Sequence, residues 1–222
     1  MARHSTEGRT GSSSPTLQRT AVLLVAVAAL LSVLAAAASG ARSASPLALT
    51  GRVFADNELA GFAAKRPPVS LTDISAWAKV APTGGIDVTA RLRHGGFVAG
   101  VREDLIWTNG NDRGALAAVV RLGSPGAAQA EIAQQLHDFA GEPHRGRAKT
   151  YAAFPVPGIP GAHGFALTTA ETSGLNIIFA DGPYTYHLGV GWGNQVTNPP
   201  TRTQLIAAVG RLYRRVHPRP AP

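Results

Sequence analysis

Histidines are the first candidates for a functional site, because imidazole can bind metals and can act in acid–base catalysis. The chain has seven histidines, and His144, His163 and His187 fall in a region expected to form strands. None of these three lies two or four residues from another, and the chain has no cysteine to complete a metal site. We therefore expect surface or locally hydrogen-bonded histidines, with His187 facing either solvent or a covering helix.

Carboxylate pairs are the second candidate for chemistry, and none is arranged for it. Glu103 and Asp104 are adjacent and would point to opposite faces of a strand, while Asp112 and Asp181 lie in expected turns. No nucleophile elbow, zinc-protease helix or phosphate-binding loop occurs in the sequence. We predict no catalytic, cofactor-binding or metal-binding residues, and no cofactor.

The stretch from Tyr184 to Gly193 is the most regular strand pattern in the chain. Tyr184, Tyr186 and Trp192 share one face, and they either line a ligand cleft beside the Pro155–Gly161 loop or belong to the core. The glycines at 189, 191 and 193 lack the ending of a dinucleotide fingerprint, because Asn194 holds that position. We interpret these glycines as residues that allow close packing of the strand or a bend in it.

Residues 21–38 are eighteen consecutive residues without a charge. As a helix they would rise about 27 Å, which is enough to cross a hydrocarbon core. Arginines precede the segment, so the N-terminus is expected in the cytoplasm and the rest outside. The segment is either a retained transmembrane anchor or a signal that is cleaved at its small-residue exit, which would give a secreted protein.

The composition fits a domain outside the cytoplasm that is held together by packing alone. The chain has 222 residues, a formal charge of +8 and no cysteine, which excludes disulfides and a cysteine nucleophile. Basic charge suits contact with the membrane, lipid headgroups or another envelope component, and the expected location argues against nucleic acid as a partner. A small ligand or an envelope protein remains a possible partner.

The remaining patterns predict an α+β fold, with a mostly antiparallel sheet packed by helices. We divide the chain into a disordered cytoplasmic tail (1–20), the apolar segment (21–38), a linker (39–50), one extracytoplasmic domain (51–217) and a disordered end (218–222). The strand expected at 97–107 has Glu103 on its apolar face, which predicts a bulge or a register change near 102–104. One core is expected, containing Phe97, Trp107, Val120, Ile132, Leu136, Phe139, Ile177 and Leu188.

A C-terminal helix is predicted from about 201 to 216. Its apolar residues recur within an arc of about 120°. That arc should dock on the sheet, leaving Arg211, Arg214 and Arg215 facing outward, where they suit the helix dipole or contact anionic headgroups.

Four short phrases in the chain are similar to those of an actinobacterial family of secreted or membrane-tethered proteins of unknown function: residues 58–62, 96–100, 158–162 and 212–213. The order of helices and strands also resembles, more weakly, the PsbP-like α/β/α sandwich, a fold used for binding and assembly. The resemblance implies a non-catalytic binding or accessory module of the cell envelope. The alternatives are an envelope hydrolase with scattered catalytic residues and a pure protein-docking module.

Overall fold

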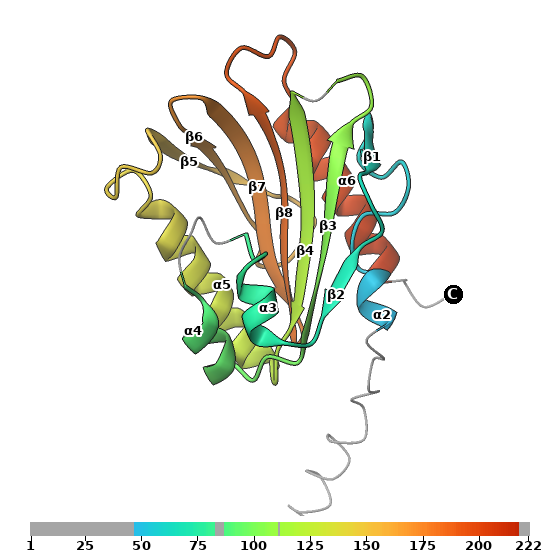
Figure 1. The fold of residues 1–222 in the computed structure, drawn as a ribbon, viewed down its shortest axis with the longest axis vertical. Coiled ribbons are helices and arrows are strands. Elements are labelled where there is room, and N and C mark those ends of the chain that lie inside the picture. Colours follow the sequence, from blue (N-terminus) through green and yellow to red (C-terminus); the bar gives the residue numbers. More distant parts are fainter. Residues whose placement is uncertain (1–46, 83–86, 111, 218–222) are drawn as a thin grey trace, which may run out of the picture. The chain divides into compact units, whose positions relative to one another are not determined.

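The computed structural model describes residues 47–82, 87–110 and 112–217, and every element below belongs to the unit that spans residues 44–222 (Figure 1). Its helices are α2 (Leu47–Thr50), α3 (Ile74–Ala78), α4 (Thr89–His94), α5 (Pro125–Ala140) and α6 (Arg202–Val216). Its strands are β1 (Phe62–Ala64), β2 (Val69–Leu71), β3 (Ala99–Trp107), β4 (Arg113–Arg121), β5 (Thr150–Pro155), β6 (His163–Thr168), β7 (Thr172–Asp181) and β8 (Tyr184–Gly193).

The eight strands form one sheet in the order β1-β3-β4-β8-β7-β6-β5, with β2 also paired to β3. Every pairing is antiparallel, so the predicted α+β class with a mostly antiparallel sheet is confirmed. The predicted transmembrane segment at 21–38 lies outside the described residues. Among the residues that are described, no helix is long and apolar enough to cross a membrane.

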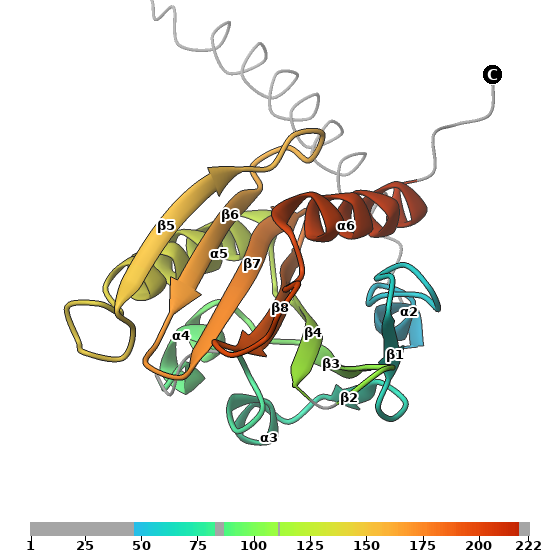
Figure 2. The same ribbon diagram turned by 90° about the horizontal axis from the view of Figure 1, so that it is seen from above.

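Helices cover both faces of the sheet, with α6 on one side and α3, α4 and α5 on the other (Figure 2). The side chains of β8 alternate between the two faces of the sheet. Tyr186 and Leu188 pack into the cluster beneath α6, while Thr185 and His187 face the helices on the other side. Because α2 carries the buried Leu49 into the α6 cluster, the folded part includes residues from the stretch predicted as a linker.

The expectation of one core is wrong, because a sheet with two covered faces has separate apolar layers. Ile177 and Leu188 lie in the α6 layer, Val120 packs with Trp77 beneath α3 and α4, and Ile132 and Phe139 pack beneath α5. Leu136, Phe97 and Trp107 are only partly buried at the edges of these clusters. Period-2 and period-3.6 patterns identify buried positions but do not say which layer they enter.

The predicted bulge near 102–104 is also wrong. Strand β3 keeps an unbroken register with β4, in which Arg102, Glu103 and Asp104 oppose Ala118, Ala117 and Leu116. Glu103 therefore stays in phase with Val101 and Leu105 and is buried on the α6 face, with only 6% of its surface exposed. The strand tolerates a buried carboxyl group where we had expected a change of register.

Helix α6 begins with a capping box, in which Thr201 and Gln204 each bond the other's backbone N–H. Leu205, Ala208, Val209 and Leu212 are buried, so the predicted apolar arc does dock on the sheet. All three arginines are exposed, as expected, but two of them also reach across to Glu58. Arg215 binds both carboxylate oxygens of Glu58, and Arg211 donates to the Glu58 carbonyl.

Arg215 therefore clamps α6 to the segment 51–58, since it also donates to the carbonyls of Gly51 and Val53. We expect Arg215→Gln to lower the free energy of unfolding by about 1–2 kcal/mol, because it breaks a charge-assisted pair that is partly open to solvent. The matched change Arg214→Gln, at the exposed neighbouring position, should cost less than about 0.5 kcal/mol. Urea unfolding of both variants measures the difference; equal stabilities would contradict the clamp.

Candidate functional site

A cleft of 890 Å³ lies over the ends of β3, β4, β8, β7 and β6. Helices α3, α4 and α5 cover the lower part of this face of the sheet in the view of Figure 1, and the cleft lies beyond them. Its volume is within the range of about 300–1,000 Å³ that is usual for ligand sites. This hollow is the largest opening described in the domain and is the candidate site.

The floor of the cleft consists of glycines on adjacent strands. Gly191 of β8 pairs with Gly114 of β4 on one side and with Gly174 of β7 on the other. A Cβ added at Gly114 or Gly191 would come no closer than 3.7 or 3.8 Å to another heavy atom, and neither residue has a positive φ. Packing and backbone geometry therefore do not require glycine at these two positions, although glycine weakens a strand.

Asn176 and His187 connect this floor to the covered part of the sheet. The Asn176 Oδ1 atom can only accept a hydrogen bond, so His187 Nε2 donates to it at 3.0 Å and Nδ1 is left as an acceptor. A Cβ at Gly189 would lie 2.6 Å from Asn176 Oδ1, so this glycine is required for the Asn176 position. Burial, followed by the charge of Arg102, lowers the pKa of His187 to about 3, and the ring is neutral at physiological pH.

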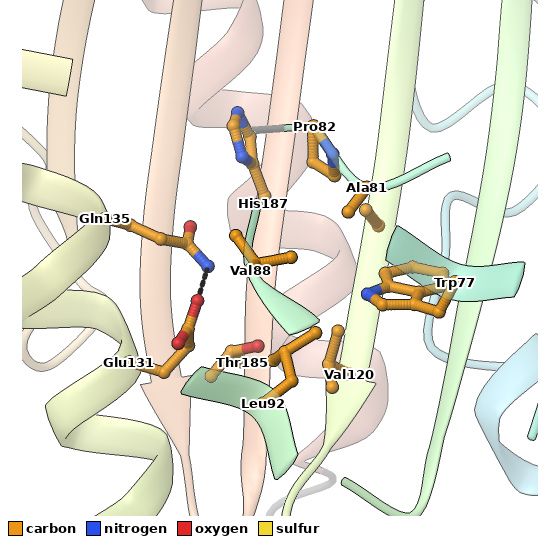
Figure 3. Close-up of a pocket in the computed structure, with 11 residues that line it drawn as sticks. Trp77, Ala81, Pro82, Val88, Leu92, Val120, Glu131, Gln135, Thr185 and His187 are labelled. Carbon is orange, nitrogen blue, oxygen red and sulfur yellow. Dashed lines mark hydrogen bonds between the residues drawn. The ribbon is translucent and has the colours of Figure 1, made fainter. Parts of the chain in front are cut away.

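Next to His187 lies a small cavity of 20 Å³, lined by His187, Gln135, Glu131, Thr185 and Trp77 among others (Figure 3). Gln135 donates to Glu131 at 2.9 Å, which leaves its Oε1 atom buried and without a partner among the described residues, as is His187 Nδ1. The volume suits one water molecule, for which these two atoms are acceptors. The cavity is too small for a larger ligand.

A salt-bridge network fixes the helices around this cavity. Arg91 of α4 binds Glu131 of α5 through two hydrogen bonds of 2.6 and 3.0 Å and reaches Asp138 at 2.8 Å. Bidentate pairs of this kind hold a fixed geometry. The covered half of this sheet face is therefore rigidly built, next to the open half that forms the cleft.

The walls of the cleft combine apolar and basic side chains. Leu116, Leu167 and Ile106 supply apolar surface. Four basic residues (Lys65, Arg66, Arg102 and Arg113) and two acidic ones (Asp104 and Asp112) line it, a balance of +2. Asp104 is shared by Arg102 at 2.7 Å and Arg66 at 3.5 Å, so one carboxylate balances two guanidinium groups. The rim therefore favours anionic ligands.

The cleft shows no arrangement for nucleophilic catalysis among its described residues. Ser173 is a lining hydroxyl, and it donates to Asn194 Oδ1 at 2.7 Å instead of to a base. Asn194 in turn donates to the carbonyls of Thr169 and Ala170, which ties β8 to the β6–β7 turn. In the part of the chain that the structure describes, no three side chains of ligand type are placed to hold a metal ion.

The aromatic residues that we had considered for a cleft lie elsewhere. Tyr184 and Tyr186 are buried in the α6 layer, where Arg52 donates to the Tyr186 hydroxyl at 2.6 Å and stacks on the Tyr184 ring at 3.8 Å. The Pro155–Gly161 loop sends Val156 and Ile159 into the same layer. Only Trp192 of the three aromatics also lines the cleft.

The histidines do not converge either. His144 and His163 are exposed, in the turn after α5 and at the start of β6, while His187 is covered by α5, with its ring 5.3 Å from that of Phe139. The glycine floor was missed as a site, since the alternation of Gly189, Gly191 and Gly193 was interpreted only as packing. That interpretation holds for Gly189 and not for Gly191.

A search of solved structures found a similar fold in the extracellular domain of PknH from Mycobacterium tuberculosis. The TM-score is 0.51 at 12% sequence identity, and the match covers 79% of this chain and all of that one. At this identity the likeness concerns the fold alone. No family model matches the sequence, and no curated protein matches it.

Proposed function

We propose that this protein is a non-catalytic binding module of the cell envelope, anchored to the outer face of the cytoplasmic membrane, and that its ligand occupies the glycine-floored cleft. One observation carries the proposal. Two paired residues of the floor, Gly114 and Gly191, are glycines although neither packing nor φ requires a glycine at these positions. Glycine within a strand is typical of places where a ligand approaches the backbone closely.

The location is supported by two independent features. The uncharged segment 21–38 with its basic flank predicts a single span with the domain outside. The fold is similar to that of a domain described as extracellular. If the segment is instead removed as a signal, the same domain would be secreted and the cleft would be unchanged.

The cleft chemistry favours an anionic ligand with a flat face. The glycine floor offers peptide surface without side chains, against which a ring can lie, and the lining charge of +2 attracts an anionic group. Envelope sugars that carry carboxylates or phosphates have both properties. We propose this ligand class, and the probe for it is a uronic-acid trisaccharide, with the neutral maltotriose for comparison.

Filling the floor tests the proposal. We expect Gly191→Val to weaken binding of the uronic-acid trisaccharide at least tenfold in isothermal titration calorimetry, because the new side chain projects into the cleft. The domain should remain folded, since valine favours strands and the new Cβ would lie 3.8 Å from the Ser173 carbonyl oxygen, an ordinary van der Waals distance.

The matched control is Ala152→Val, which adds a valine at an exposed position of β5 outside the cleft. It should bind the trisaccharide as the unaltered chain does. Equal binding by the unaltered chain and Gly191→Val, or equal binding of the charged and neutral sugars, would count against the cleft or its preference for anions.

A further inference from the structure

A second cavity, of 240 Å³, lies on the other side of β3, between the turn at residues 54–57 and strand β1. Its rim is exposed and contains Asp56, Asn57 and Ala64. Its inner wall is buried and apolar, with Phe54, Leu59, Phe62 and Leu105, and it ends at Glu103. The space runs from solvent to a buried carboxyl group and has room for several waters or a short alkyl chain.

Glu103 lacks a partner on one side. One carboxyl oxygen accepts the Phe54 backbone N–H, and Oε2 is buried without a hydrogen bond from any described residue. The Arg215 guanidinium, whose charge acts on Glu103, is already used, because it binds both oxygens of Glu58 at 2.8 and 2.9 Å. A buried oxygen of this kind carries the cost of lost hydration unless a donor reaches it.

The charges around the cavity favour a cation. Asp56 at the rim and Glu103 at the base are both carboxyl groups, and burial together with the Asp56 charge raises the pKa of Glu103 to about 7. A cationic donor at the base would supply the missing hydrogen bond and relieve the repulsion between the two carboxylates. Phe54 and Phe62 also line the cavity, and aromatic side chains are compatible with an ammonium group or its alkyl chain.

We propose that this cavity binds a primary alkylammonium group, with its nitrogen donating to Glu103 Oε2 and its alkyl chain between Phe54 and Phe62. The group belongs either to a small free amine or to a lysine side chain, since both present the same chemistry. A quaternary ammonium has no N–H donor and does not satisfy the site. The site lies on the other side of β3 from Arg102, Asp104 and Ile106, which line the cleft, while Leu105 lines both hollows.

The test is calorimetric titration of the full chain at pH 8 and low salt with n-butylammonium, with tetramethylammonium, and with the neutral 1-butanol. We expect n-butylammonium to bind at least tenfold more tightly than either of the others. Glu103→Gln should reduce that affinity at least tenfold, while Glu171→Gln, at an exposed turn, should leave it unchanged. A parallel titration with N-acetyl-lysine methylamide separates the sources: tighter binding than n-butylammonium indicates a lysine side chain, and weaker binding a free amine.

A second variant tests the same cavity in case Glu103→Gln does not fold. Ala64 is exposed and opposes Leu105, so Ala64→Leu should narrow the cavity without disturbing the core, and it should weaken n-butylammonium binding severalfold. The proposal is overturned if n-butylammonium binds no better than 1-butanol, or if folded Glu103→Gln binds it as the unaltered chain does.

Discussion

Leu212→Asp is expected to unfold the domain or to detach helix α6 from the sheet. Leu212 is completely buried in the layer that also holds Leu205, Val209 and the inward side chains of β7 and β8. The change removes a leucine from a packed core and places a carboxylate there without a partner. Both effects act in the same direction, and we expect a loss of more than about 4 kcal/mol in the free energy of unfolding.

The control introduces the same group on the same helix at an exposed position. Ala207→Asp should cost less than about 1 kcal/mol, since its side chain points to solvent. Circular dichroism and urea unfolding of the two variants distinguish the outcomes. A Leu212→Asp protein as stable as Ala207→Asp would mean that α6 does not dock through this face.

Glu103→Gln is expected to stabilise the domain at neutral and alkaline pH by about 2–3 kcal/mol. Burial and the Asp56 charge raise the pKa of Glu103 from 4.5 to about 7 in the folded chain. Between these values the folded state binds more protons than the unfolded state, so the free energy of unfolding falls as pH rises through the window. Glutamine cannot ionise and keeps the shape of the side chain, and the slope should disappear.

Urea unfolding at pH 4, 5.5, 7 and 8 measures this difference between the two chains. Glu58 does not obscure it. Burial is the largest single influence on the pKa of Glu58 and raises it, but the hydrogen bonds from Arg215 and the Ala55 N–H and the charges of Arg215 and Arg211 together hold that pKa below 4.5, outside the window. The other facing groups, Asp56 and Arg215, are common to both chains. The assignment fails if the two chains have the same stability at pH 8, or if the glutamine variant is the less stable one.

Sequence patterns were sufficient for the class of fold and for the secondary structure of the longest elements. The alternation in β8 and the 3.6-residue periodicity of α6 are regular enough to be recognised in the sequence. The number of apolar layers could not be predicted from the sequence, because a pattern shows that a side chain is buried but does not show which element covers it. The buried Glu103 was missed for a related reason: a local pattern treats a charge on an apolar face as a break in the strand.

The candidate site was harder to predict because its floor is made by the absence of side chains. Gly114, Gly174 and Gly191 come from three strands, and only the register of the sheet makes them neighbours. The partners of Arg211 and Arg215 were missed in the same way, since Glu58 lies about 150 residues earlier in the chain. Contacts at such separation depend on the assembled fold and leave no local signal.

Chemical-shift mapping by NMR tests the central claim most directly. The full chain, labelled with ¹⁵N and purified in a mild detergent, would be titrated with the uronic-acid trisaccharide at low salt. The account predicts that the largest amide shifts fall at Gly114, Gly174 and Gly191, on the floor of the cleft. Shifts confined to α6 and the opposite face of the sheet, or none at millimolar sugar, would contradict it.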